Sequence, residues 1–491
     1  MEGISLISFI YHWQQRGYFT SIDNSRMPIK IHPIIWLGLI CFIPMTACNT
    51  TPRYWSETQL TFSDQNHELD HNENFSPNDQ WIVYDTRPNP AGIGQNTKIE
   101  KVHVSSGKQQ TLYQVSNPTA YGPGVGAVSY HPFLPQVVFI HGLESASEMY
   151  PYAGHRRTGV ILDERNLGSR YFMDSRDIQE PFVPGALRGG THRHQWSGDG
   201  DWIGFTYNDA LMVDLEAETG QKHDLRTIGV SKRIGPKVPV KPDSTGENIQ
   251  GEWFSALVVP VVSNPRPGTN EISRAYEDWW VGSHGYRKRD GTYQRSRAFL
   301  GDLITLDGEN ITEVFVVDIP DNIHIPGNRG PLEGTVETMP APPQGVSIRR
   351  ITRTENRTHP GVATTPRHWV SSPADGSYIS YLAKDDAGIV QVFLVSPLGG
   401  EPIQATHHET DVQSMVRWHP NSVTFAYVAD NSLFTAEISS EGKVSNPIRI
   451  TEKNDEAPFA HCWSRKGDSI AFNRYVSNDE KKYIQIFTTV P

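Results

Sequence analysis

The feature that most constrains the fold is a short motif that recurs along the chain. Each copy has an aromatic residue or Ser, then Ser or His, often Pro, a polar turn, and a short apolar run. Pro fixes φ, while Gly, Asn or Asp accept the positive φ of a tight turn, so each copy predicts a β-hairpin. The six copies begin at Phe75, Tyr130, Trp196, Ser371, Trp418 and Trp463.

One such hairpin cannot bury its faces alone, whereas several arranged radially can. The sequence therefore predicts an all-β fold, a β-propeller of about seven four-stranded blades, with six as the alternative count. The interval from Trp196 to Ser371 leaves room for one degenerate blade, which we place at 253–319 on WFSALVVPVV and ITEVFVVDI. Further strands are expected after five of the hairpins, at KIEKVHV, TGVILD, LMVDLE, VQVFLVS and SLFTAEI.

The two ends of the repeat region each provide a strand without a blade of its own. QLTF at 59–62 precedes the first hairpin, and IQIFTT at 484–489 follows the last one. If these strands pair, they complete the last blade and remove an exposed sheet edge. We therefore expect the ring to be closed by its N- and C-terminal strands.

The N-terminal segment has the pattern of an export signal. An apolar run at 34–45, too short to span a bilayer, follows basic residues and precedes Thr-Ala-Cys at 46–48. This arrangement resembles a bacterial lipoprotein signal, which implies a lipid on Cys48 and, with Asn49 next to it, a periplasmic location at the outer membrane. We expect residues 1–48 to be an extension and signal, and residues 49–491 to be one propeller with a long, insertion-rich blade around 235–345.

Composition limits the partners. The net charge of -11 argues against a nucleic-acid binder, which needs a basic surface. Of three cysteines only Cys462 lies beyond the signal region, so an internal disulfide framework is excluded. We expect a monomer that touches the membrane only through its lipid and that binds an envelope protein or a carbohydrate.

The most informative local segment is GGTHRHQW at 189–196, which should form an innermost strand beside the channel. With a two-residue period, His192 and His194 share one face of the strand, and Arg193 and Gln195 share the other. Two histidines on one face are candidate ligands for a metal ion. Arg193 and Gln195 are candidate ligand-binding residues.

A propeller gathers equivalent positions around one axis, which extends the candidate site to other blades. His71, His368 and His461 precede their own hairpins, as His192 and His194 do. Together they predict a site for Mn, Zn or Fe. Histidines that only bond turn backbones are the alternative. Glu73 and Arg188 are further ligand-binding candidates, and the segments 154–157 and 276–280 are weaker rim candidates.

Two resemblances bear on the fold. The hairpin motif resembles the TolB-type propeller repeat, whose consensus is close to FSPDGKWIVF. The segment PGALRGGTHRHQWSGDGDWIGFTYND at 184–209 resembles the YidR-like family of uncharacterised bacterial proteins. These resemblances imply a propeller and an envelope location, but no catalytic residue.

Two functional hypotheses remain open at the level of the sequence. The first is a non-catalytic binding or docking module, favoured by the missing catalytic constellation. The second is a metal-dependent enzyme similar to oligogalacturonate lyases, which are also His-rich propellers. That similarity implies a lyase of acidic sugars, in which Arg188 or Arg193 neutralises a uronate and a histidine acts as the base.

Overall fold

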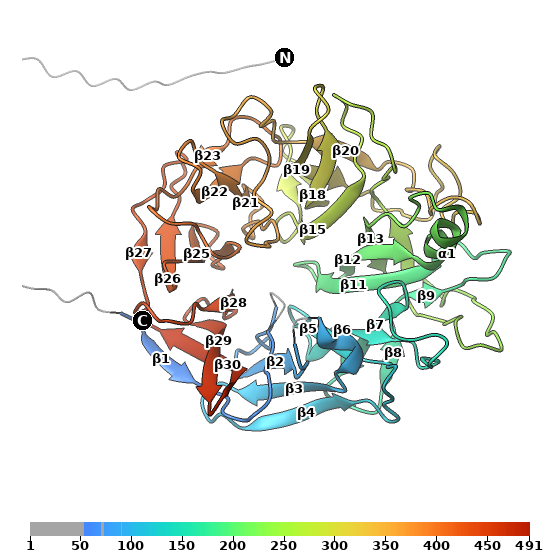
Figure 1. Cartoon of the computed structure of the whole chain (residues 1–491), viewed down its shortest axis with the longest axis horizontal. Helices are drawn as coiled ribbons and strands as arrows, with labels where there is room; N and C mark the ends of the chain where they lie inside the picture. Colours follow the sequence, from blue (N-terminus) through green and yellow to red (C-terminus); the bar gives the residue numbers. More distant parts are fainter. Residues whose placement is uncertain (1–53, 70–72, 90) are drawn as a thin grey trace, which may run out of the picture. The chain divides into compact units, whose positions relative to one another are not determined.

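The computed structural model describes residues 54–69, 73–89 and 91–491. Seven antiparallel sheets are arranged as blades around a central axis (Figure 1). The predicted seven-bladed propeller is therefore confirmed. Cys48 and His71 lie outside the described residues. No helix in the described part of the chain is both long and apolar enough to cross a bilayer.

The first three blades follow the chain order, each from the axis outward. Blade 1 has single bridges from Phe75 to Ile82 and from Glu68 to Asp85 beside its regular strands. The strands are β2 (Trp81–Asp85), β3 (Lys98–His103) and β4 (Gln109–Gln114) in blade 1; β5 (Val125–Tyr130), β6 (Gln136–Gly142), β7 (Arg157–Asp163) and β8 (Arg170–Phe172) in blade 2; and β11 (Gly189–Trp196), β12 (Trp202–Asp209), β13 (Thr227–Lys232) and β14 (Phe254–Leu257) in blade 3.

The remaining blades complete the ring. Blade 5 has a single bridge from Ser371 to Ser380 at its innermost position. The strands are β15 (Arg274–Trp280), β18 (Ser296–Ile304), β19 (Asn310–Asp318) and β20 (Ser347–Arg350) in blade 4; β21 (Ile379–Lys384), β22 (Val390–Val395) and β23 (Ile403–Gln404) in blade 5; β24 (Arg417–Trp418), β25 (Thr424–Ala429), β26 (Ser432–Glu437) and β27 (Ile448–Arg449) in blade 6; and β28 (Phe459–Trp463), β29 (Ile470–Asn478), β30 (Lys481–Val490) and β1 (Ser56–Gln59) in blade 7.

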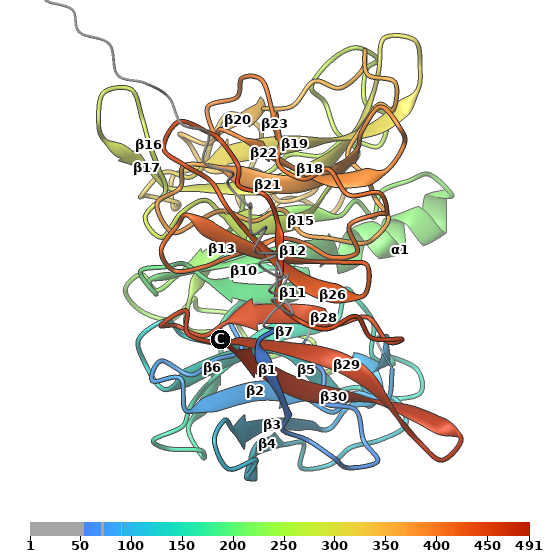
Figure 2. The ribbon, with the colours of Figure 1, turned by 90° about the vertical axis from the view of Figure 1, so that its left-hand side faces the viewer.

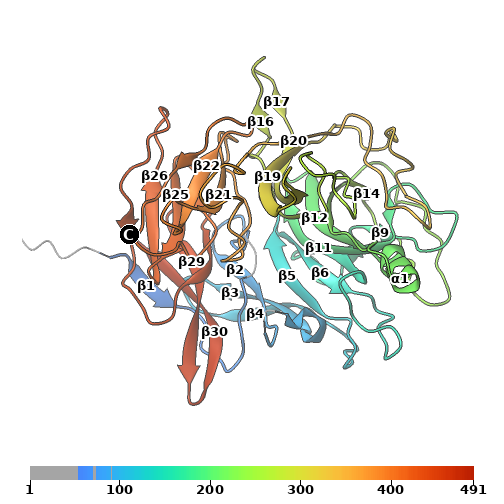
Figure 3. The ribbon, with the colours of Figure 1, turned by 45° about the horizontal axis from the view of Figure 1, so that its top comes forward.

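Short elements decorate this frame. A hairpin of β16 (Tyr286–Arg287) and β17 (Tyr293–Gln294) is inserted into blade 4 and projects from the ring (Figure 3). β9 (Ser175–Arg176) and β10 (Ala186–Leu187) form a small parallel pair, and η1 (Gly92–Gln95) is a single 3-10 turn.

The ring is closed by strands from the two ends of the chain. β1 pairs antiparallel with β30, from Ser56 opposite Val490 to Gln59 opposite Phe487 (Figure 2). The expected closure is confirmed, although the closing strand ends where the sequence had placed its start. Arg474 of β29 supports the pairing through an ion pair of 2.7 Å to Glu57.

The Ser or His of the hairpin motif caps the turn by accepting a hydrogen bond from a backbone amide. The Ser76 hydroxyl accepts from the Trp81 amide at 3.0 Å, and Ser197 accepts from Trp202 at the same distance. His419 replaces the serine in blade 6, where its Nδ1 accepts from the Asn421 amide at 2.9 Å. The side chain satisfies a turn N–H that has no strand partner.

Two segments form elements that differ from the sequence expectation. LMVDLE is not a strand but part of α1 (Ala210–Thr219), because Asp209 caps the helix N-terminus and Gly220 ends it with φ of 69°. The third strand of blade 3 is instead β13. WFSAL forms β14, the outer strand of blade 3, so the extra blade begins only at β15.

The core lies between neighbouring blades. One cluster joins Val138 and Ile161 of blade 2 to Phe205 and Leu257 of blade 3. Because each sheet buries both faces, its central strands are apolar without strict alternation. The central strands β6, β12 and β25 show this pattern, with nearly all residues buried. Cys462 is a free, fully buried thiol in one of these layers, and burial raises its pKa to about 12.

Candidate functional site

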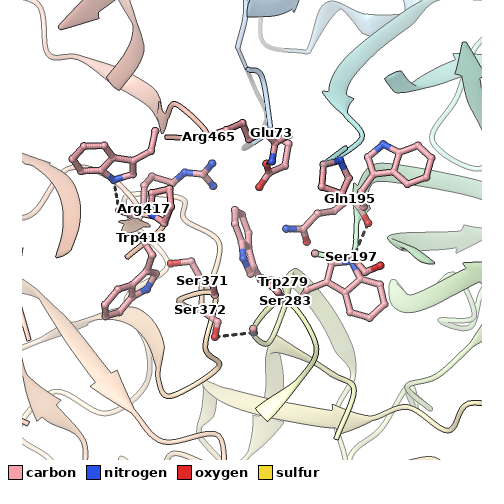
Figure 4. A pocket seen from close by; sticks show the side chains of 18 of the residues that line it. Glu73, Gln195, Ser197, Trp279, Ser283, Ser371, Ser372, Arg417, Trp418 and Arg465 are labelled. Carbon is pink, nitrogen blue, oxygen red and sulfur yellow. Dashed lines mark hydrogen bonds and ion pairs between the residues drawn. The ribbon is translucent and has the colours of Figure 1, made fainter. Parts of the chain in front are cut away.

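All seven blades contribute to one cavity of about 560 Å³ at the end of the channel where the inner hairpins turn. We call it the seven-blade pocket. Figure 4 shows polar and aromatic side chains from several blades arranged around it, with the Trp279 indole near the centre. Its polar and aromatic lining includes Glu73, Phe133, Gln195, Trp196, Trp279, Trp280, Ser283, Ser371, Ser372, Arg417, Trp418, Trp463 and Arg465.

Two of the pocket's tryptophans are held by hydrogen bonds between blades. Trp463 of blade 7 donates its indole N–H to the Arg417 carbonyl of blade 6 at 3.0 Å. Trp280 of blade 4 makes the equivalent bond to the Gln195 carbonyl of blade 3, also at 3.0 Å. Fixed indoles form a preorganised wall, because little side-chain freedom remains to be lost on binding.

Below the pocket, arginines and tryptophans alternate in a stack that we call the Arg–Trp ladder. The guanidinium carbon of Arg417 lies 4.7 Å from the Trp279 ring centre, and that of Arg193 lies 5.6 Å from the same ring. Arg193 also lies 3.8 Å from Trp369, which Arg367 approaches to 4.7 Å. Cation–π contacts thus connect side chains of blades 3, 4, 5 and 6 inside the channel.

A bulge in the innermost strand places Arg193 in this ladder. Arg193 has φ of 50°, and the register between β11 and β12 shifts around it. Ala127, Glu277 and Ala460 have the same backbone conformation in blades 2, 4 and 7. Each lies three residues before the aromatic that ends its strand. Positive φ at a non-glycine residue costs about 1–3 kcal/mol, and such strain concentrates at functional sites.

Charged and amide groups complete the pocket. Glu73 of blade 1 forms an ion pair with Arg465 of blade 7, across the closure of the ring. The Gln195 side-chain oxygen accepts from Arg297 at 3.3 Å. Burial, with little compensation from neighbouring charges, lowers the pKa of Arg417 to about 10.

The structure places the four predicted ligand-binding residues differently. Gln195 and Glu73 line the seven-blade pocket, and Arg193 lies in the ladder beneath it. Arg188 does not line this pocket, and its role in binding stays a prediction. Its guanidinium is fully buried, forms an ion pair of 2.8 Å with Asp209 and donates to the Thr338 carbonyl, so it holds blade 3 to the 331–342 loop.

The predicted metal ligands of β11 have other partners. His192 Nδ1 accepts from Arg157 at 2.9 Å, and its Nε2 faces the Asn208 side-chain oxygen at 3.2 Å. Both ring nitrogens therefore have partners, and the partner of Nδ1 is a guanidinium. His194 Nε2 bonds Thr191 at 2.8 Å, and its ring packs against Gly159 of blade 2.

The other two described histidines are also engaged locally. His368 Nε2 accepts from the Leu382 amide at 3.1 Å, and its Nδ1 faces the Pro366 carbonyl at 3.2 Å. His461 Nε2 faces the Ala426 carbonyl at 3.1 Å. Within the described ranges no three His, Cys, Asp or Glu side chains form a group that could hold a metal. His192, His194, His368 and His461 therefore do not assemble the predicted Mn, Zn or Fe site.

Residues of the pocket that sequence reasoning missed are mainly aromatic. Trp196, Trp418 and Trp463 each stand at the start of a hairpin motif, a position that had been read only as the end of a strand. Trp279 and Trp280 fall in the weaker candidate segment 276–280, which is part of strand β15 and not a loop. The sequence did contain a signal for these residues, namely their place at the start of the motif, because a ring of blades brings the first motif residue of each blade to the same end of the channel.

Comparison with known proteins shows the family of the chain. Residues 124–246 match the family described as "Protein of unknown function (DUF3748)". Over 404 residues the chain is 39% identical to "Uncharacterized protein YidR" of Escherichia coli (strain K12), covering 82% of this chain and 90% of that protein. The chain belongs to the YidR family.

Two solved structures found by comparison of folds have low sequence identity to this chain. TolB from Acinetobacter baumannii is 13% identical with a TM-score of 0.33, covering 76% of this chain and 67% of that one. An oligogalacturonate lyase in complex with manganese is 10% identical with a TM-score of 0.48, covering 89% and 93%. At these values the two structures carry no inference about activity.

Proposed function

We propose that the propeller is a binding module and that its seven-blade pocket takes a small polyhydroxylated ligand of the carbohydrate type. The observation that carries this proposal is the lining of the pocket, where indole rings alternate with hydroxyl, amide and guanidinium groups. Such a lining offers apolar faces to C–H surfaces and polar groups to hydroxyls, as small-molecule sites generally do.

The polar groups of the pocket favour binding over catalysis. The Ser371 hydroxyl bonds Ser380 at 2.6 Å and the Val416 carbonyl at 2.7 Å, so it is not activated by a base. His419 uses both ring nitrogens, Nδ1 for Asn421 and Nε2 for the Gly467 carbonyl at 3.1 Å. Among the described lining residues no hydroxyl bonds a histidine, so the nucleophile–base pair of covalent catalysis is not formed there.

The metal-dependent lyase remains the alternative from the sequence, but no described residue strengthens it. Its supporting features were the His192 and His194 pair, Arg188 and the histidines at the starts of other strands, and the described members of this set all have structural partners. We further propose an envelope location with a lipid on Cys48, and a monomeric state. These proposals rest on the signal-like pattern at 34–48 and on ring closure within one chain.

The binding proposal is tested by titrating the full chain with a panel of neutral and uronic mono- and oligosaccharides while following tryptophan fluorescence. A saturable change is expected for at least one sugar. Trp418→Ala, which removes a half-buried pocket wall, should weaken that binding at least about tenfold. Trp279→Phe should weaken it less, because an aromatic ring is kept.

Trp81→Ala is the matched control, since Trp81 of β2 is not among the residues that line the pocket and its ring meets His103 edge-on. It should leave the affinity unchanged. A panel without any saturable response, or equal losses in Trp418→Ala and Trp81→Ala, would overturn the proposal.

A further inference from the structure

A second cavity lies at the opposite ends of the strands that form the seven-blade pocket. It has a volume of about 450 Å³ and is formed by blades 3 and 4. Arg226 directly precedes Thr227, which pairs with Tyr207 near the end of β12. The other end of β12 begins at Trp202, next to the 197–201 turn at the seven-blade pocket, so Arg226 lies at the far end of the blade. We call this space the arginine cavity. Its lining includes Asn208, Lys222, Arg226, Ser263, Ser273 and Arg274.

The arginines of this cavity have no carboxylate partner. Among the described residues no ion pair is found for Arg226 or Arg274. The half-buried Arg226 donates one hydrogen bond, to Thr206 at 3.0 Å, and the exposed Arg274 lies over the Tyr276 ring, 3.9 Å from its centre. Nε of Arg226 and Nε of nearby Arg157 are shielded from solvent and without a hydrogen-bond partner. Such groups are costly to bury unless something else satisfies them.

The arginines also repel one another. Burial, together with Arg274, Arg367 and Arg157, lowers the pKa of Arg226 to about 10, against the opposing attraction of Glu277. A protein with a net charge of -11 thus concentrates like positive charges at one place. Repulsion of this kind destabilises the unoccupied protein and is relieved when an anion binds.

The two carboxylates that line the cavity are already engaged. Asp302 accepts from Tyr276 at 2.9 Å and from Thr312 at 2.7 Å. Asp224 accepts from the Asn208 amide at 2.8 Å. The donors to both carboxylates are neutral groups, and Asp302 lies opposite Arg274 in the pairing of β15 with β18.

We propose that the arginine cavity binds the oxyanion group of a small ligand, a phosphate, sulfate or carboxylate, through Arg226 and Arg274. The planar guanidinium fork matches these groups and bonds them through two parallel N–H donors. Ser263 and Ser273 add hydroxyl donors on the same wall. The site is separate from the seven-blade pocket, so the proposal does not depend on what that pocket binds.

The test uses isothermal titration of the full chain with inorganic phosphate, sulfate and citrate at constant ionic strength. Arg226→Gln keeps a hydrogen-bonding side chain and removes the charge. It should weaken binding of the effective anion at least about tenfold, as expected for loss of a charge-assisted bond. The control is Arg289→Gln, an exposed arginine on the β16–β17 turn, which should bind the anion as the parent does.

Thermal unfolding without added anion gives a second readout. Arg226→Gln should unfold at the same temperature as the parent or a higher one, because repulsion is relieved. A merely structural arginine would instead lower that temperature. The three anions separate phosphate or sulfate from carboxylate chemistry. Absence of binding to all three, or equal binding by the parent and Arg226→Gln, would overturn the proposal, whatever the sugar titrations give.

Discussion

The contact between His419 and Gly467 allows one stability prediction to be worked through. Gly467 lies in the inner hairpin turn of blade 7 with φ of 79°, and His419 reaches it from blade 6. The imidazole lies edge-on to Trp463, with ring centres 4.8 Å apart. Blades 2 and 3 repeat the arrangement, since His131 lies 4.6 Å from Trp196 and against Gly200. The pair therefore joins two neighbouring blades.

The perturbation is Gly467→Ala. A Cβ at this position would lie 1.9 Å from His419 Nε2, so the imidazole must move away. Positive φ costs alanine about 1–2 kcal/mol. Loss of the hydrogen bond costs about 0.5–1.5 kcal/mol, and loss of the edge-on ring contact about 0.5–1.5 kcal/mol. The free energy of unfolding should therefore fall by about 2–5 kcal/mol.

The assay is urea unfolding followed by tryptophan fluorescence and circular dichroism. Gly220→Ala is the control, because Gly220 has φ of 69° and an added Cβ meets nothing within 4 Å. It should cost only the backbone strain of about 1–2 kcal/mol. In the double variant His419→Ala/Gly467→Ala, the alanine at 467 should cost no more than the control. The reasoning is refuted if Gly467→Ala and Gly220→Ala cost the same, or if removing His419 does not reduce the cost at 467.

Three further predictions concern titration and targeting. Burial lowers the pKa of His141 and of His368 to about 4, so on acidification the unfolded chain takes up protons before the folded chain does. The free energy of unfolding should therefore fall as the pH drops from about 6.5 to 4, by up to about 3 kcal/mol for each histidine. Urea midpoints that do not change over this pH range would contradict the prediction. Burial raises the pKa of Asp174 from 3.8 to about 7, so its contribution to stability is lost progressively as the pH rises through that range; Asp174→Asn should raise the melting temperature most at pH 8, less at pH 5 and not at pH 3. Cys48→Ser should abolish incorporation of radiolabelled palmitate, whereas labelling that persists would rule out this lipidation site.

The sequence predicted the hairpins well because their turn chemistry is local. Ser76 and Ser197 cap turns that a reader can find from Ser, Pro, Asp and Gly alone. LMVDLE was misread as a strand although Asp209 and Gly220 are ordinary helix signals, because the repeat suggested a strand there. In that segment the two helix-capping residues determine the structure, and the spacing of the propeller repeat does not.

The candidate site was predicted in part. Equivalent positions do converge at one mouth, as Gln195 and Arg417 show, each of which directly precedes the tryptophan of its motif. The histidines of the metal hypothesis have other partners in the structure, some from another blade, as Arg157 beside His192, and some nearby in the chain, as Thr191 beside His194. The bulge at Arg193 has positive φ without a glycine, so the sequence contains no residue type that would predict it. The Arg–Trp ladder depends on four blades and becomes visible only in three dimensions.

Ring closure has a consequence for how the protein is made. Ser56 pairs with Val490, so β1 cannot form its sheet pairing until the last residues of the chain are available. Contacts so distant along the chain form slowly, and six blades must stand with an open edge until the C-terminal hairpin is available. A nascent chain shortened by one hairpin would retain most of its sheets and still expose an unpaired edge. During synthesis the propeller therefore stays open, with an unpaired sheet edge, until the C-terminal strand is made.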